Sequence, residues 1–480
     1  MGKRIPMWQI LLVFVVLIGG LMFTILKVGG YVHIPLLAGG AFAAVIAIAN
    51  GFKWSYLEKG IIKNIGNAMQ ALLILLTVGM LIGSWIAGGI VPSMIYYGLM
   101  ILSPGIFLIA TCLICCIVSL ATGSSWTTAG TVGIALIGIG SGLGISLGMT
   151  AGAIISGAYF GDKMSPLSDT TNLAPAMAGT VLFEHIKHMV YTVTPSLIIA
   201  LILFGIMGFN HSKNNADLSS VTELMNGLSD NFYISPVLLI PALLIILMVV
   251  FKVPALPGLF AGVILGILCA VIFQGGDWAS LAGIGLYEGY VSESGIEFID
   301  SLLSRGGLSS MFYSVSLVIC AMVLAGVLDA SDILKIVCEH LLKVAKNTGS
   351  LVLVVIITCI GCNILAADQY IAIVLPGRMY KEVFEDRRLK RKNLSRILED
   401  SGTMTSALVP WSTCGTFMSS TLGVATVAYL PYCFLNLMNP LVSLFYGFTG
   451  ITMEKMSEEE YQAILRQREA DAAAEAKLIA

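Results

Sequence analysis

The sequence predicts an all-α membrane protein that crosses the bilayer many times, and three observations support this prediction. Only 11% of the 480 residues are charged, against roughly 25% in an ordinary soluble domain. Hydrophobic residues make up 57% of the chain, and the mean hydropathy is +0.91. The apolar residues form many separate runs, most of them near or above the roughly 18 residues that span a bilayer as a helix. A soluble fold would lack the polar surface to cover itself, so we expect membrane lipid around the chain.

The first membrane segment follows a basic start. Lys3 and Arg4 precede an apolar run at 8–27, which resembles the start of a signal peptide. The run is too long for one and has no small-residue cleavage site, so we predict a retained helix within residues 1–29. Further membrane helices are predicted at 33–50, 68–90, 105–121, 124–139, 143–161, 188–209, 234–251, 256–274, 309–328, 349–366, 368–378, 401–420 and 424–448.

Two of these segments are too short to cross a bilayer unaided. Residues 124–139 and 368–378 each follow a longer run directly, which predicts helical hairpins that enter and leave by one face. Non-helical backbone at that depth is tolerated only where protein or a water-filled cavity satisfies its amides. The hairpin turns are therefore candidate binding positions.

The chain contains an internal similarity. Residues 35–48 match 257–270, and the order of matching segments persists further along the chain. We predict two repeats, 30–209 and 254–448, joined by a linker and connecting helix at 210–253. Charge in the loops favours opposite orientations of the two halves. Inverted repeats place a transporter's binding site near the midplane, where interrupted segments of both halves meet.

The distribution of charge predicts the orientation. The most basic loop, 378–396, is assigned to the cytoplasm by the positive-inside rule, together with the N-terminus. The polar linker 210–232 and the acidic segment 277–305 suit the outside. The tail 449–480 is predicted to be a solvated cytoplasmic helix.

Several function classes find no support in the sequence. The net charge of −2 gives no reason to expect a nucleic-acid partner. The ten cysteines lie mostly inside apolar runs and are interpreted as small buried hydrophobes rather than metal ligands. No H-E-x-x-H, phosphate-binding loop or Ser/His/Asp arrangement is present, so we predict that the protein is not an enzyme and needs no cofactor.

The first chemical motif is the stretch 121–130, at the turn of the first predicted hairpin. Its hydroxyl groups, including those of Ser124, Ser125 and Thr127, are hard ligands that suit Na⁺. Helix N-termini at such a turn would suit an anion. Close helix packing through small residues is the alternative explanation.

The second motif is the stretch 157–175, which carries Asp162 and Asp169. Pro166 and Pro175 bracket a segment that we expect to be unwound. We predict that both aspartates hold Na⁺, because desolvation favours a neutral carboxyl group whereas a bound cation favours the ionised form. A site that holds either the cation or protons couples the two flows. The alternative is an exposed loop. The predicted supporting ligands in this stretch are Ser165, Ser168, Thr170 and Asn172.

The second half supplies two further candidates. Asp368, with Gln369 beside it, falls at the second hairpin turn, where the first copy has Gly123. Asp400 matches Asp162 in the repeat, but it borders the basic loop. Pairing with Arg396 is its ordinary explanation, and ion binding or proton coupling is the functional one.

These motifs resemble those of the NhaC-type sodium/proton antiporters of bacteria. The resemblance rests on 122–133, on 161–175 and on the 367–370 and 410–415 elements, and it covers nearly the whole chain. It implies secondary active transport in the cytoplasmic membrane, with Na⁺ leaving as H⁺ enters. The wider family includes exchangers of malate against lactate and carriers of amino acids, so a small organic anion or amino acid remains an alternative substrate. The resemblance is consistent with a homodimer, which the sequence does not show.

Overall fold

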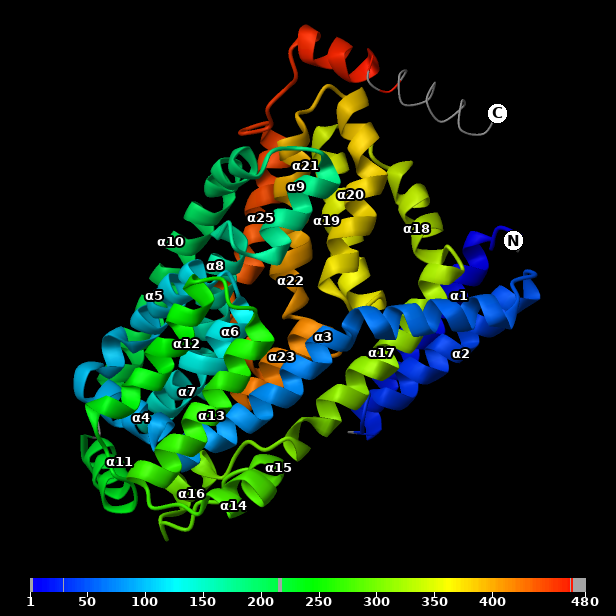
Figure 1. Ribbon diagram of the computed structural model, residues 1–480. Coiled ribbons are helices and arrows are strands. Elements are labelled where there is room, and N and C mark those ends of the chain that lie inside the picture. The colour runs from blue at the N-terminus through cyan, green and yellow to red at the C-terminus, as the bar shows by residue number, and fades with distance from the viewer. Residues whose placement is uncertain (1–2, 29, 215–217, 467, 469–480) are drawn as a thin grey trace.

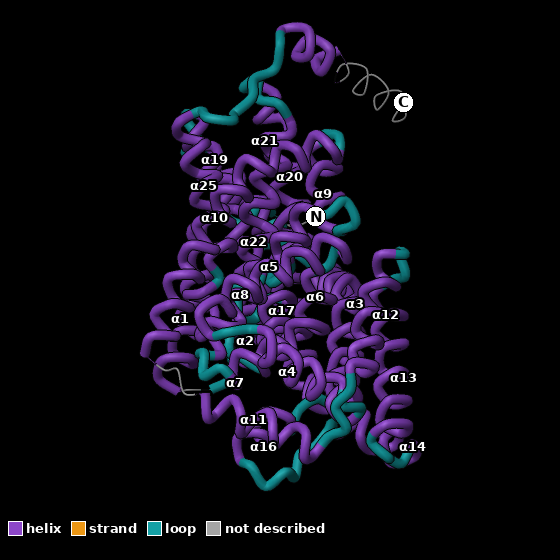
Figure 2. Tube along the Cα trace, turned by 90° about the vertical axis from the view of Figure 1, so that its left-hand side faces the viewer, coloured by secondary structure: helices purple, strands orange, loops and turns teal. Residues whose placement is uncertain are grey.

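The computed structural model describes residues 3–28, 30–214, 218–466 and 468 (Figure 1). These residues form helices joined by short breaks, and their only β-type pairings are two isolated bridges. The prediction of an all-α fold is confirmed. Figure 2 shows the same helical arrangement from the side.

The first half of the chain contains long helices interrupted by short breaks. Within it, three π-helical or 3-10 turns adjoin α-helices. The elements are α1 (Met7–Phe23), η1 (Thr24–Val28), α2 (His33–Ala49), α3 (Trp54–Ala87), α4 (Ile90–Ile101), α5 (Pro104–Thr122), α6 (Ser125–Thr128), η2 (Ala129–Gly133), α7 (Ile134–Gly142), α8 (Leu147–Met164), α9 (Asp169–Ala178), α10 (Leu182–Asn214), α11 (Leu218–Asn231), η3 (Pro236–Leu239) and α12 (Ile240–Val250).

The second half has shorter pieces at both ends of its membrane helices. Its elements are α13 (Ala255–Phe273), α14 (Trp278–Ser280), η4 (Leu281–Gly285), α15 (Leu286–Glu288), α16 (Glu297–Leu303), η5 (Ser309–Met311), α17 (Phe312–Ala330), α18 (Ile333–Leu342), α19 (Thr348–Leu365), α20 (Gln369–Asp386), α21 (Arg391–Leu398), η6 (Glu399–Thr403), α22 (Met404–Ser406), α23 (Thr413–Leu422), α24 (Thr426–Tyr429), η7 (Leu430–Tyr432) and α25 (Phe434–Thr449).

Six helices of the described residues are long and apolar enough to cross a membrane, or eight if two bent pairs each count as one span. The prediction of a multi-pass membrane protein is therefore confirmed. Several predicted segments differ from the structure. The helix expected at 401–420 is divided into η6, α22 and α23, and the segment expected at 424–448 is bent between η7 and α25. The helix expected at 68–90 starts at Trp54, and the short segment expected at 368–378 continues to Asp386 as part of α20. In both cases the helix extends into a polar sequence beyond the apolar run, where hydropathy alone has no signal.

The long helices α2, α3, α13 and α17 pack in crossed pairs. Helix α2 packs on α17, α13 packs on α3, and α3 packs on α17. Each of the first-half helices α2 and α3 thus packs on a helix of the second half. Because α13 is the predicted counterpart of α2, these contacts are the pattern expected of two related halves. The inverted relation between the halves stays a prediction.

Elements with different charge lie at opposite ends of the molecule. In Figures 1 and 2, α21 lies at the same end as the described part of the C-terminal segment, and α11, α14 and α16 lie at the other. The C-terminal segment is attached there by an isolated bridge between Leu389 and Lys455. The membrane-spanning helices and the central broken helices, α6, α8, α9 and α23, lie between the two ends.

Candidate functional site

A cavity of about 810 Å³ lies among the broken helices. Residues from α3, α6, α9, α20 and α23 line it, together with the segment that joins α12 to α13. The N-terminal turns of α9, α20 and α23 all contribute lining residues, so three helices present their N-terminal ends to one space. Helix N-termini carry partial positive charge, which favours carboxylates and other anions beside them.

Each break is stabilised by a local capping contact. Helix α5 ends at Gly123, whose φ of +69° suits a residue without a Cβ, and the Ser124 hydroxyl accepts a hydrogen bond from the Thr127 amide at 3.1 Å. The Asp368 carboxylate accepts from the Ile371 amide at 3.0 Å. The Ser412 hydroxyl accepts from the Gly415 amide at 2.9 Å. These caps satisfy backbone amides that would otherwise be exposed in the membrane interior.

The break between α8 and α9 is braced by side chains of α9. The Thr171 hydroxyl donates to the backbone oxygens of Asp162 and Lys163, at 2.7 and 2.9 Å. The Asn172 amide donates to the backbone oxygens of Pro166 and Ser168, at 2.9 and 2.7 Å. The backbone oxygens of Pro166 and Ser168 in the unwound segment therefore accept hydrogen bonds from α9. The break is therefore rigidly held.

Asp162 lies at the end of α8 and borders the cavity. One of its carboxylate oxygens accepts a hydrogen bond from the Ser125 hydroxyl at 2.5 Å, and the other accepts from the Ser168 hydroxyl at 2.7 Å. Only 8% of the residue is exposed. The structure thus brings together a carboxylate of the second motif and a hydroxyl of the first, across the break.

The two other acidic residues of the cavity have different environments. Asp169 is exposed, and the Tyr370 hydroxyl lies 3.4 Å from one of its oxygens. Asp368 is half-buried and caps α20. Because Asp162 is the most enclosed of the three and has two hydroxyl donors, it is the carboxylate best placed to exclude water from a bound ion.

Most of the predicted site residues lie around this cavity. Ser168 does not line the cavity but donates a hydrogen bond to Asp162. Ser165 and Asn172 form hydrogen bonds within the break between α8 and α9. The predicted residues that line the cavity are Ser124, Ser125, Thr127, Asp162, Asp169, Thr170, Asp368 and Gln369.

Asp400 does not line the cavity. It is buried in an ion pair with Lys163, and its other oxygen lies 3.6 Å from Nε of Arg396. The Thr192 hydroxyl donates to it at 2.8 Å, and Lys163 also donates to the Asn439 side-chain oxygen at 2.6 Å. The expected pairing with Arg396 is present, and Lys163, which follows Asp162 in the chain, is a second and nearer partner. Asp400 is therefore not placed to contact a cation in the cavity directly.

Several cavity residues were not among the predicted ligands. Asn67 and Gln70 lie on α3, at the start of its apolar run, and Lys252 lies in a turn with a positive φ of 63°. Trp126 also lines the cavity and stacks on Phe417, with ring centroids 4.0 Å apart. Asn67 and Gln70 were the available signal, because these side-chain amides lie at the start of a membrane-length apolar run.

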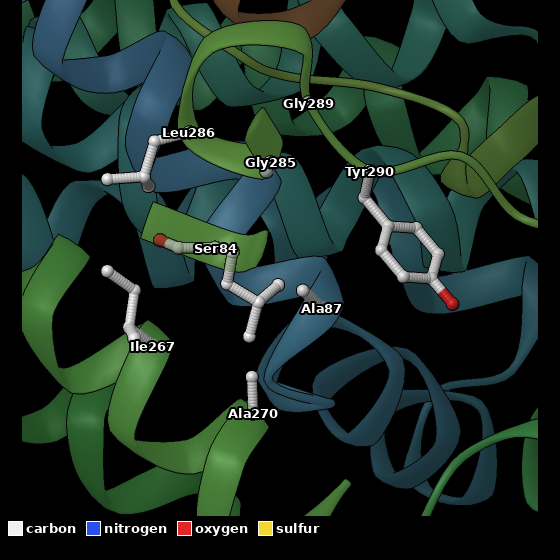
Figure 3. A pocket seen from close by; sticks show the side chains of 10 residues that line it. Ser84, Ala87, Ile267, Ala270, Gly285, Leu286, Gly289 and Tyr290 are labelled. Carbon is white, nitrogen blue, oxygen red and sulfur yellow. The ribbon is translucent and has the colours of Figure 1, made fainter. Parts of the chain in front are cut away.

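A second, much smaller hollow lies where α3, α13 and α15 meet (Figure 3). Its volume of about 20 Å³ is enough for roughly one water molecule. Ala87, Ile267, Ala270 and Leu286 surround it, and the hydroxyl of Ser84 donates to the backbone of its own helix. Apolar hollows of this size stay dry, so this one is a packing defect rather than a binding site.

Membrane-crossing helices, breaks at the level of a polar cavity and an enclosed carboxylate together define a membrane transporter. The described residues contain no group of three or more His, Cys, Asp or Glu side chains placed to hold a metal ion.

The chain belongs to the Na⁺/H⁺ antiporter family, whose sequence profile matches residues 157–451. The malate-2H⁺/Na⁺-lactate antiporter of Bacillus subtilis strain 168 is 40% identical over 87% of this chain and 89% of its own. The Na⁺/H⁺ antiporter NhaC of Alkalihalophilus pseudofirmus is 37% identical over 92% and 96%. The arginine/ornithine antiporter ArcD of Halobacterium salinarum is 36% identical over 95% of each chain. A solved structure of Neisseria gonorrhoeae MtrF matches at 12% identity with a TM-score of 0.37 and covers 82% of this chain and 84% of that one.

Proposed function

We propose that the protein exchanges Na⁺ for H⁺ across a bacterial cytoplasmic membrane and that the two ions compete for Asp162. The observation that carries this proposal is the enclosed carboxylate with hydroxyl donors on both of its oxygens. Membership of the family and the names of relatives such as NhaC support the choice of ions.

The hydroxyl groups explain how one site accepts either ion. A serine hydroxyl is both a donor and an acceptor. Ser125 and Ser168 donate to the ionised carboxylate in the ion-free state, and a small rotation turns their oxygens toward a cation beside it. When Asp162 is protonated, one of the same hydroxyl oxygens accepts a hydrogen bond from its carboxyl O–H. Asp169 and the hydroxyls of Ser124, Thr127 and Thr170 are the further ligands that we propose for Na⁺.

The charged ends of the molecule support the proposed orientation. Arg4 forms an ion pair with Glu339 on α18, and Arg387, which follows α20, donates to the backbone of the segment after α18. The start of the chain and the basic segment 378–396 therefore lie at one end. By the positive-inside rule this end is cytoplasmic.

The exchange is tested in proteoliposomes with a pH-sensitive dye inside. Adding sodium chloride to wild-type vesicles should produce proton movement that saturates with Na⁺, and Asp162→Asn should abolish it while the protein still elutes as a folded species. Asp169→Asn should abolish or strongly reduce the same signal. Asp230→Asn, at an exposed residue on α11, is the matched control. Wild-type exchange by Asp162→Asn would refute the assignment.

A second candidate function is sodium- and proton-coupled exchange of a small carboxylate or amino acid. The cavity of about 810 Å³ is much larger than a single Na⁺ requires, and three helix N-termini border it. A carboxylate group could bind at those amides. Proton flux with sodium chloride alone, compared with sodium malate, lactate or an amino acid inside and outside, separates the two functions.

A further inference from the structure

A third cavity, of about 340 Å³, lies at the opposite end of α23 from the main one. The first residues of α23, Thr413 and Cys414, line the main cavity, whereas Ser420, Thr421 and the glycine that ends the helix line this one. Its volume is in the range of small-molecule sites, which begin at roughly 300 Å³.

An aromatic stack lies on α23 between the two cavities. Trp126 lines the main cavity, and its ring lies on that of Phe417 with an interplanar angle of 11°. Phe417 is one turn after Thr413 and one turn before Thr421 along α23. This stack therefore separates the third cavity from the main one along α23. We call the third cavity the outer cavity.

The outer cavity contains an arginine without an acidic partner. Among the described residues, no carboxylate lies within ion-pair distance of Arg305. Its guanidinium donates one hydrogen bond, from Nη2 to the backbone oxygen of Leu422 at 3.1 Å. Burial lowers the pKa of this side chain from its ordinary value, and no neighbouring charge offsets that effect. Most N–H groups of the guanidinium are therefore available to a ligand.

The backbone is shaped to hold that guanidinium in place. Gly423 ends α23 with a φ of +67°, and a Cβ at this position would lie 1.5 Å from Nη2 of Arg305. Only glycine leaves room for the arginine here. Part of the role of Arg305 is thus to stabilise the negative end of the α23 dipole, but one hydrogen bond to one carbonyl does not use a planar, forked donor fully.

A second polar group of the outer cavity also lacks a partner. The hydroxyl of Thr421 is buried, and it has no hydrogen-bond partner among the described residues. Buried polar groups without partners are rare in folded proteins and call for a ligand or water. The hydroxyls of Ser304 and Ser310 line the same space, and Tyr290, whose side chain is seen in Figure 3, closes it toward the small apolar hollow. Glu288, the one acid in the lining, is exposed.

We propose that the outer cavity binds the carboxylate group of a small organic solute, with Arg305 as the charged donor and Thr421 as a second donor. The ligand is a hydroxy acid or an amino acid of a few carbon atoms. If it is an amino acid, its ammonium group lies toward Glu288. This inference deepens the proposed exchange of a carboxylate, on which it rests, and places the solute on the side of the stack that faces away from the basic end of the molecule.

Binding is measured on purified full-length protein in nanodiscs by isothermal titration calorimetry, with sodium lactate, sodium malate and alanine as probes and sodium chloride at equal ionic strength as the reference. Wild-type protein should bind at least one probe saturably. Arg305→Gln and Arg305→Lys should weaken that binding tenfold or more, because lysine keeps the charge but not the forked geometry. Thr421→Val should weaken it several-fold. Arg388→Gln, at an exposed arginine paired with Glu458, is the control and should bind as wild type.

The outcomes separate this inference from the proposed ion exchange. The unfolding temperature of Arg305→Lys in detergent should match that of wild-type protein, which verifies that the fold is intact. Absence of saturable binding by wild-type protein, or equal affinity in wild type and both Arg305 variants, overturns the inference even when Na⁺/H⁺ exchange is normal. Weaker alanine binding in Glu288→Gln with unchanged lactate binding identifies the amino acid as the ligand, whereas saturable binding of lactate or malate but not of alanine by wild-type protein identifies the hydroxy acid.

Discussion

The buried ion pair between Lys163 and Asp400 offers the strongest prediction about stability. Both side chains are fully buried, and Lys163 directly follows Asp162 at the end of α8. Lys163→Met removes one partner and keeps the length of the side chain. It leaves Asp400 with the Thr192 hydroxyl at 2.8 Å and the Arg396 Nε at 3.6 Å.

Removing one member of a buried pair costs about 3–5 kcal/mol where an uncompensated charge remains, and the Arg396 guanidinium beside Asp400 places Lys163→Met toward the lower end of that range. That cost lowers the folded-to-unfolded ratio by a factor of roughly a hundred to a few thousand. Asp400→Asn should cost a similar amount, since it leaves the ammonium group of Lys163 with the Asn439 side-chain oxygen alone. The double variant should fall short of the sum of the two costs by about 1–3 kcal/mol, because neither charge is then present.

The assay is reversible unfolding in mixed micelles, followed by tryptophan fluorescence. Arg388→Met breaks an exposed pair whose side chains are 54% and 58% accessible, so it is the control, with an expected cost of about 0–1 kcal/mol. If Lys163→Met is no less stable than Arg388→Met, or if the costs of the single variants simply add, the pair does not stabilise the end of α8 as argued.

Three further predictions concern single positions. Ser125→Ala removes a hydroxyl oxygen that we propose as a ligand of Na⁺, a loss of about 1 kcal/mol, so the Na⁺ concentration for half-maximal exchange should rise about fivefold in proteoliposomes; an unchanged value would contradict a role in the cation site. Gly161→Ala should abolish folded yield on size-exclusion chromatography, because its Cβ would lie 2.1 Å from a backbone nitrogen of α5, whereas Gly66→Ala, with nothing within 4 Å, should fold normally. Hydrogen bonds from two serine side chains lower the pKa of Asp300 from 3.8, so the stability that it contributes is present above pH 3.8 and is lost as the pH falls through the lower, folded-state pKa; proteolysis of the 290–304 loop in Asp300→Asn at neutral pH should resemble that of the acidified wild type.

The sequence predicted the helices and the breaks well because both depend on local composition. The crowding of hydroxyls and glycines at 121–130 marks a break, and Pro166 marks another, but the segment up to Pro175 that we expected to be unwound is helical from Asp169 onward as α9. The meeting of Ser125 with Asp162 follows if the two breaks face one space, as the structure shows. Broken helices are therefore predictable where a polar motif interrupts an apolar run, whereas the helical hairpins stay a prediction.

The partners of the charged residues were not predictable in the same way. Lys163 and Asp400 are far apart in the chain, and Arg396 is four residues from Asp400, so the local pair was the natural interpretation. Arg305 was assigned to an outer loop, and nothing in the sequence indicates that this loop folds back onto the end of α23. Such contacts depend on how helices pack, which short-range patterns do not encode.

The convergence of helix N-termini also required the structure. The caps at Asp368 and Ser412 are recognisable as polar residues that start helices, but their approach to the N-terminus of α9 depends on the crossing of helices from both halves. Candidate ligands were therefore predictable from the sequence, whereas the approach of positively polarised helix N-termini to those ligands depends on the tertiary arrangement.

The central claim is that Na⁺ and H⁺ exclude one another at Asp162, and proton release measures this most directly. Purified protein in weakly buffered detergent solution near neutral pH is titrated with sodium chloride, and the released protons are followed with a pH indicator. Wild-type protein should release protons saturably with Na⁺ and not with choline chloride, and Asp162→Asn should release none. Equal release by wild type and Asp162→Asn would contradict the account.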